Sequence, residues 1–126
     1  MPTKKEVFVD LMNLLKTNIT EVSNRVYSSY PKKKVTFPFI IVSNPEYSEK
    51  EFTISNEVIL YSFVITIYIY TKTSQELDEL TQKVIDLLKN NDILGSTKEI
   101  TEEKPTEYNE NNSIIHEGAI IVELEW

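Results

Sequence analysis

His116, followed directly by Glu117, is the residue pair in this sequence whose chemistry comes closest to that of a catalytic or metal-binding site. Histidine changes its charge near neutral pH, and with a neighbouring carboxylate it can act as a general base or as a ligand. Such a site also needs a nucleophile or a second ligand at a fitting spacing, and none accompanies His116. We therefore interpret His116 as a structural or exposed histidine.

Acidic side chains are the second group that could take part in chemistry, as ligands of a divalent cation or as acid–base residues. Five of them cluster late in the chain: Glu99, Glu102, Glu103, Glu107 and Glu110. They lack the alternating Asp or Asn ligands and the turn glycine of a calcium-binding loop, so we interpret them as a solvated segment. Asp78 and Glu79 lie on a predicted helix, and nothing in the sequence places a pocket beside them.

Composition excludes further kinds of site. Without cysteine the chain has neither a disulfide framework nor a thiolate site. With only two glycines, Gly95 and Gly118, it lacks a glycine-rich loop for phosphate binding. We thus predict no catalytic residue, no metal site and no cofactor, and a protein that is not an enzyme.

The net charge of −7 at pH 7 bears on the possible partners. Nucleic-acid affinity depends on cations that meet phosphates, so this balance argues against a nucleic-acid-binding protein. We interpret the basic cluster Lys32-Lys33-Lys34, beside Pro31, as a solvated turn that discourages pairing at a sheet edge. No apolar run reaches the length of about 18 residues that a membrane span needs, and no secretory signal is visible, so we predict no membrane partner.

Two amphipathic helices are expected to position the rest of the chain. Thr3 and Glu6 have the spacing of a capping box, and apolar residues recur at helical spacing behind them. Thr73 or Ser74 caps the second helix. Each helix has one apolar stripe and should therefore cover one surface. The helices are predicted over residues 4–18 and 74–90.

A strand of unusual length is predicted between the two helices. Residues 57–71 form a run of about twice the usual strand length, apolar on both faces. By the two-residue alternation of a strand, Ile65 and Ile67 point to one face, which needs a core. The other face is neither polar nor fully apolar and carries Val64, Thr66, Tyr68 and Tyr70. Further strands are predicted near 37–42, near 98–102 and at 114–126.

These elements predict a single α+β domain over residues 1–126, in the order α-β-β-α-β(β). Its single mixed or antiparallel sheet has about four strands, with two helices packed on one face and mobile loops near 44–57 and 99–113. Two helices cannot cover both faces of such a sheet, so the face with Val64 is left for a partner. The predicted subunit or partner interface comprises Val64, Thr66, Tyr68, Tyr70, Ile121, Glu123, Tyr47 and Phe52.

The order of elements resembles that of a known family. A leading amphipathic helix is followed by Pro38-Phe39-Ile40-Ile41-Val42 and by a long strand that ends Val64-Ile-Thr-Ile-Tyr-Ile-Tyr70. After the second helix the chain closes on Gly118-Ala-Ile-Ile-Val-Glu-Leu-Glu-Trp126. This pattern is similar to that of the tail terminator and tail-completion proteins of long-tailed bacteriophages, including the related head-to-tail joining proteins. The likeness covers nearly the whole chain as a pattern of elements.

The resemblance implies a structural protein of the virion, in its tail or neck region, that is made in the cytoplasm of the host bacterium. In that family, copies form a hexameric ring that caps the tail tube, ends its polymerisation and joins it to the head. The implied partners are other copies of the chain, the tail tube protein and a neck or head-completion protein. Genomic DNA would pass through an acidic lumen without specific binding.

Three other hypotheses remain open on the sequence. Another neck component, a head-completion or stopper protein, would share the pattern and differ only in which surface meets which partner. A cellular oligomeric α+β binding module, dimeric through the same uncovered face, belongs to a different class. An unrecognised small enzyme is the last alternative, and no motif supports it.

Overall fold

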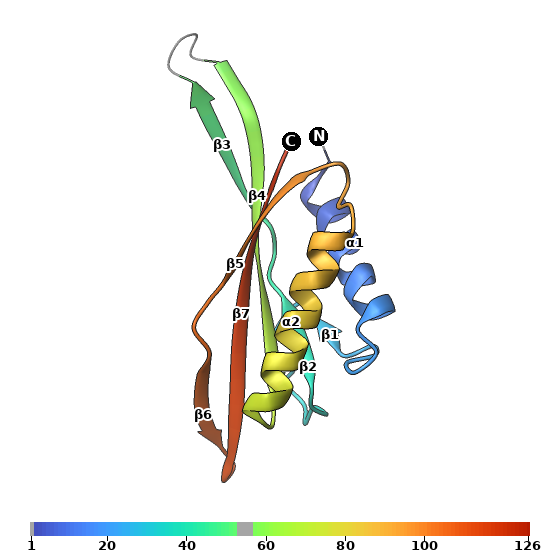
Figure 1. Cartoon of the computed structure of the whole chain (residues 1–126), viewed down its shortest axis with the longest axis vertical. Coiled ribbons are helices and arrows are strands. Elements are labelled where there is room, and N and C mark those ends of the chain that lie inside the picture. The colour runs from blue at the N-terminus through green and yellow to red at the C-terminus, as the bar shows by residue number, and fades with distance from the viewer. Residues whose placement is uncertain (1, 53–56) are drawn as a thin grey trace.

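The structure, a computed structural model, describes residues 2–52 and 57–126, with residues 48–52 and 57–60 described by their backbone alone. Within that part the chain forms two helices and one mixed seven-stranded sheet, which confirms the α+β class (Figure 1). The helices are α1 (Lys4–Asn18) and α2 (Ser74–Asn90). The strands are β1 (Val26–Tyr27), β2 (Phe39–Val42), β3 (Glu46–Phe52), β4 (Glu57–Thr71), β5 (Thr97–Glu102), β6 (Thr106–Glu110) and β7 (Ser113–Glu125).

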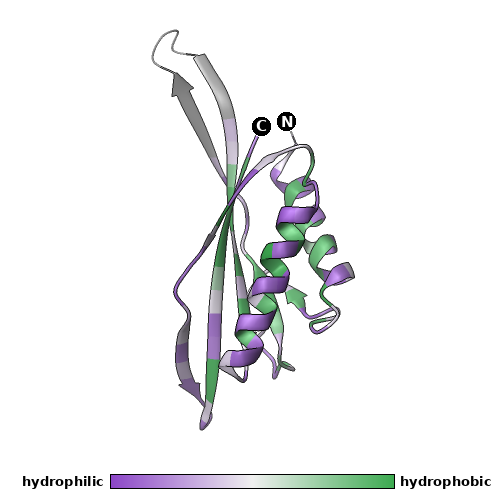
Figure 2. Ribbon diagram, in the orientation of Figure 1, coloured by the Kyte–Doolittle hydropathy of each residue, from purple (hydrophilic) through white to green (hydrophobic). Residues whose placement is uncertain are grey.

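The sheet has more strands than the four or so that the sequence predicted. Strand β5 agrees with the strand predicted near 98–102, whereas the structure places β3 in the segment near 44–57 and β6 in the segment near 99–113, where we expected loops. These strands escape prediction from apolar periodicity because they are polar: all five residues of β6 are exposed, and Figure 2 shows β6 as hydrophilic. The mobility of both segments stays a prediction, and residues 53–56 lie outside the described part.

Both helices begin at the predicted capping residues. At α1, Thr3 Oγ1 accepts a hydrogen bond from the Glu6 N–H at 3.2 Å, and Glu6 Oε1 accepts one from the Thr3 N–H at 3.3 Å. The capping box is therefore confirmed. At α2, Thr73 Oγ1 accepts from the Glu76 N–H at 3.1 Å, which makes Thr73 the cap rather than Ser74.

The two longest strands, β4 and β7, form the centre of the sheet (Figure 1). They pair antiparallel over ten residue pairs, from Ser62 opposite Glu125 to Thr71 opposite His116. On its other side β4 pairs with β2 toward its C-terminal end and with β3 toward its N-terminal end. Strand β7 pairs in the same way with β5 and β6. The short β1 runs parallel to β2 and makes the sheet mixed.

Both helices pack on the same face of the sheet, as the sequence predicted (Figure 1). Because opposite residues share a face, Ile65 stands beside Val122, and both are fully buried beneath the helices. Helix α2 approaches β7 closely at Gly118, where a Cβ atom would lie 2.9 Å from Leu77 Cδ1. The helical side of this core comprises Val7, Leu11 and Leu15 of α1, and Leu77, Leu80, Val84, Ile85 and Leu88 of α2.

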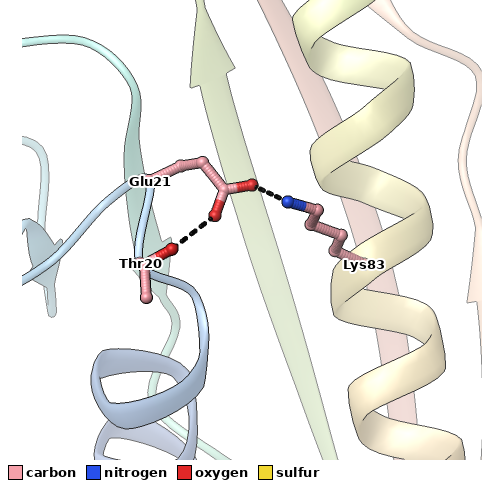
Figure 3. A network of polar contacts seen from close by, with 3 residues as sticks. All are labelled: Thr20, Glu21 and Lys83. Atoms are coloured by element: carbon pink, nitrogen blue, oxygen red, sulfur yellow. Dashed lines mark hydrogen bonds and ion pairs between the residues drawn. The ribbon is translucent and has the colours of Figure 1, made fainter.

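A polar contact joins the segment after α1 to helix α2 (Figure 3). The Lys83 ammonium donates to the Glu21 carboxylate, which also accepts from the Thr20 hydroxyl at 3.1 Å. The hydrogen bond from Lys83 is the main reason why the pKa of Glu21 lies below its ordinary value. Both charged side chains reach the solvent, so this ion pair adds little to the stability that the apolar core provides.

The substitution Gly118→Val tests the close packing between β7 and α2. A valine side chain must displace Leu77, which is itself buried, so we expect the free energy of unfolding to fall by about 1–3 kcal/mol. Urea unfolding followed by circular dichroism measures this loss. The matched control is Ala119→Val, whose half-buried side chain points to the opposite face and should change stability by about 0.5 kcal/mol or less. Equal losses in the two variants would contradict the packing.

Candidate functional site

The face of the sheet turned away from the helices, here called the underside, carries most of the predicted interface residues. They alternate along β4 and β7 with the residues that face the helices. Six of the eight predicted residues lie on it: Val64, Thr66, Tyr68, Tyr70, Ile121 and Glu123. The underside nevertheless has two regions with different surroundings, so these six side chains do not form one uniform surface.

One region of the underside has no helix or strand over it among the described residues (Figure 1). It is formed by Val64, Thr66 and Ile121, here called the open patch. Thr66 stands opposite Ile121 in the ladder, and Val64 is the next residue of β4 on the same face. All three side chains are half-buried by their neighbours in the sheet and belong to neither buried apolar cluster of the protein. A mixed surface of this kind is suited to burial against another protein.

A row of carboxylates crosses the sheet at the level of Val64. The register sets Glu46 of β3 opposite Val64. It also sets Val64 opposite Glu123 of β7, and Glu123 opposite Glu99 of β5. Glu46 and Glu99 are exposed, whereas Glu123 is half-buried. These three glutamates, here called the acidic row, span roughly 14 Å, because neighbouring strands lie about 4.8 Å apart.

The other region of the underside is covered by the chain itself, which corrects one prediction. Tyr70, predicted to lie in an interface, is only 6% exposed. Its ring stacks on that of Phe39 with the centroids 4.8 Å apart, and it meets the ring of Tyr30 edge-on at 5.5 Å. Tyr30 belongs to residues 28–38, which connect β1 to β2 and fold over this end of the sheet. The ring of Tyr70 is therefore part of a second core.

The rings of Tyr70, Phe39 and Tyr30, together with that of Tyr108, are here called the aromatic cluster. The surroundings of its hydroxyl groups raise two pKa values. Desolvation raises the pKa of Tyr70 above its ordinary value, and a hydrogen bond with the Glu117 carboxylate raises it further. The pKa of Tyr108, in the exposed strand β6, is also raised, first by partial desolvation of its hydroxyl group and then by a hydrogen bond with Tyr30. The Tyr30 hydroxyl donates to Glu110 at 3.3 Å. The cluster thus ties β6 to the segment that covers the underside.

The remaining predicted interface residues have other positions. Tyr68 is half-buried and packs against the edge of the aromatic cluster. Tyr47 stands opposite Phe63, on the face that carries the helices, and is 43% exposed. It does not share a face with the open patch, and its place in a subunit or partner interface stays a prediction. The side chain of Phe52 lies outside the described part of the chain.

A basic pocket lies at the covered end of the underside, and sequence analysis missed it. Its volume is about 810 Å³, and residues 30–37, Lys72 and the turn between β6 and β7 contribute to its walls. The three lysines predicted to form a solvated turn are exposed as expected, but they line this pocket together with Lys72. We call the site the lysine pocket, formed by Lys32, Lys33, Lys34 and Lys72.

Antiparallel pairing brings Lys72 to the lysine pocket. Phe39 stands opposite Tyr70, so the same register carried two residues further puts Lys72 beside Phe37. The Lys72 ammonium lies 4.7 Å from the centre of the Phe37 ring in a cation–π contact. Among the described residues, the other three lysines have no ion-pair partner. The signal that could have revealed the pocket is therefore the pairing of the two predicted strands, extended past their ends.

The structure gives His116 no catalytic surroundings within the described residues. It stands opposite Thr71 on one side and Glu107 on the other. In the same part of the chain, no three His, Cys, Asp or Glu side chains gather where a metal ion could bind. Of the two helices described, neither has both the length and the hydropathy of a bilayer-spanning segment. The predicted absence of a catalytic, metal or cofactor site stays a prediction.

Comparisons with known proteins assign no family. No family model matches the chain, and no curated protein matches it. The resemblance to tail terminator proteins therefore stays an interpretation of the sequence pattern, and the functional argument depends on the geometry of the underside.

Alkaline unfolding tests the burial of Tyr70. The unfolded chain loses the Tyr70 proton from about pH 10, whereas the folded chain keeps it, so stability should fall as the pH rises above about 10. In Tyr70→Phe this decline should be shallower by up to about 1.4 kcal/mol per pH unit, as measured by urea unfolding between pH 9 and pH 11 at intervals of roughly half a unit. Glu117→Gln serves as the control and should keep most of the decline, because burial is its main cause. A decline of the same steepness in Tyr70→Phe and the wild type would contradict the burial of this hydroxyl.

Proposed function

We propose that this chain is a structural subunit of a long-tailed phage particle, acting in the tail or neck region of the virion. Copies form a ring, a hexamer according to the resemblance, that caps the tail tube, ends its polymerisation and joins it to the head. The protein performs no reaction and takes no cofactor. The observation that carries the proposal is the open patch, where the centre of the sheet has helices on one face and, among the described residues, no layer on the other.

The composition of the open patch supports burial against another copy of the chain. Val64 and Ile121 are apolar, and Thr66 between them is small and uncharged. A neighbour could therefore cover these side chains without leaving a charge unpaired. The three residues also lie on the central strands, where the chain's own covering segment does not reach.

The two edges of the sheet support contacts with different partners. On one side β3 is outermost along the first part of β4, and on the other side β5 and β6 are outermost along β7. Such edges carry backbone groups that can pair with a strand of another protein, while their charged side chains discourage indiscriminate pairing. These edges are the surfaces that we propose for the tail tube protein and for a neck or head-completion protein.

The distribution of charge supports a lumen through which DNA passes without specific binding. The chain has a net charge of −7, with 20 acidic residues against 13 basic ones. An acidic wall offers no cations that could replace the counterions of the phosphates, so a duplex would slide past it. The lysine pocket, at the covered end of the underside, would have to face a subunit rather than the lumen.

The substitution Ile121→Lys tests whether the open patch is buried in an assembly. A lysine in the middle of a subunit contact must lose its hydration, so assembly should require about tenfold or more protein. The monomer should remain folded, because Ile121 is half-buried and outside both apolar clusters. Native mass spectrometry and sedimentation velocity of the full chain measure the assembly, and circular dichroism checks the fold.

The matched control is Asn13→Lys, which adds the same charge on the exposed face of α1, in the layer of helices. It should assemble as the wild type does. A wild-type particle with the mass of about six chains supports the ring, whereas a stable dimer would favour a cellular binding module. Normal assembly of Ile121→Lys would show that the open patch is not a subunit contact.

A further inference from the structure

The lysine pocket concentrates positive charge in a protein that is negative overall. Four of the 13 basic residues line it. One carboxylate, that of Glu110, shares the lining and accepts a hydrogen bond from Tyr30. Other basic side chains are already engaged within the chain: Lys83 pairs with Glu21, and Lys98 donates to backbone carbonyl groups at the end of α2. The pocket therefore presents a local excess of cations to the outside.

The acidic row lies too far along the same face to neutralise the pocket within one copy. Lys72 follows Val64 by eight residues of extended chain, roughly 27 Å at about 3.4 Å per residue. Lysine and glutamate side chains cannot bridge that distance, and charges are screened beyond about 8 Å at physiological salt. One face of the molecule thus carries two separate patches of opposite sign.

We infer that the lysine pocket of one copy binds the acidic row of a second copy, an inference that rests on the proposed assembly of the chain with itself. Ammonium and carboxylate groups form charge-assisted hydrogen bonds, so the two patches match in chemistry. The pocket, of about 810 Å³, has room for glutamate side chains. Phe37 and Tyr30 add apolar walls that the glutamate stems can contact.

A second copy suits this pocket better than a nucleic acid does. A phosphate backbone long enough to meet all four lysines would also approach Glu110, and its continuation along the underside would meet the acidic row. That approach is unfavourable, because carboxylates repel phosphates and the non-specific affinity of a nucleic acid comes mainly from cations. The carboxylates of the acidic row, in contrast, are few and are held at the fixed spacing of neighbouring strands. Their number and spacing suit a pocket that has only four lysines.

The separation of the two patches decides what kind of assembly the contact can build. Because the pocket and the row are different surfaces, each copy can give its acidic row to one neighbour and its lysine pocket to another. Such a heterologous contact repeats from copy to copy and closes into a ring when the rotation allows. The contact would then run beside the open patch, which the same neighbour would cover.

Charge reversal at both patches tests the contact. The double variant Lys33→Glu with Lys34→Glu reverses the pocket, and the double variant Glu46→Lys with Glu99→Lys reverses the row. All four side chains are exposed, so both variants should fold. Each should need about tenfold or more protein than the wild type for half-assembly, as measured by sedimentation velocity of the full chain at low salt. Raising the salt to about 1 M should weaken the wild-type assembly in the same direction.

Restoring opposite charges provides the sharper test. A chain that carries all four reversals should assemble like the wild type, because each contact again joins opposite charges. An equimolar mixture of the two double variants should also assemble, with the two chains alternating. The matched control is Lys4→Glu with Lys5→Glu, which makes the same change of charge on the exposed start of α1 and should leave assembly unchanged.

The outcomes separate this inference from the proposed function. If the wild type forms rings and neither double variant weakens them, the pocket contact is wrong and the ring proposal is unaffected. The same holds if the chain with all four reversals does not regain assembly. A dimer that the reversals abolish supports the pocket contact and overturns the ring. A wild-type chain that stays monomeric overturns both. If the pocket reversal abolishes binding of a fluorescent single-stranded oligonucleotide while assembly is unchanged, the pocket binds polyanions and the inference is wrong.

Discussion

Pairing between β4 and β7 determines where every other element of this protein can lie. The ladder sets Ile65 beside Val122 on one face and Thr66 beside Ile121 on the other, so each strand has apolar residues on both faces. The two helices have one apolar stripe each, and both stripes pack on the central part of one face. The apolar residues of the other face therefore have to be covered by other segments of the chain or by a partner. Residues 28–38 cover one end of it, and within the described part of the chain nothing covers the centre.

Sequence patterns predicted the elements that bury an apolar face and missed those that do not. The caps of both helices, the long strand and the one-sided helical layer follow from local hydrogen bonding and from periodicity, which the residues themselves carry. Strand β6 has no buried residue, so its only local signal is the turn that follows it. Asn111 and Asn112 both have positive φ there, at 48° and 64°, as a two-residue hairpin turn requires. An Asn-Asn pair between two extended segments is thus better evidence of a hairpin than apolar alternation.

For the candidate site, the sequence predicted which face of the sheet the side chains of β4 occupy, but not which other segments cover or pair with that strand. Alternation alone places Val64 and Thr66 on the underside, and the structure agrees. Alternation cannot show that a distant segment returns over Tyr70, because that depends on tertiary packing of residues 28–38. The face that Tyr47 occupies depends on the register between β3 and β4, which is set by pairing rather than by the residue itself. Lys72 reaches the lysine pocket for the same reason.

Charge on this protein works against association in general and favours it in one orientation. Copies with a net charge of −7 repel one another at long range, which keeps unpaired chains apart. At short range, two copies attract when the lysine pocket of one meets the acidic row of the other. If pocket meets pocket, or row meets row, like charges repel. The apolar residues of the open patch carry no such direction, because burial of apolar surface is indifferent to orientation. The open patch would thus supply the affinity of a contact between copies, while the two charged patches would choose its geometry.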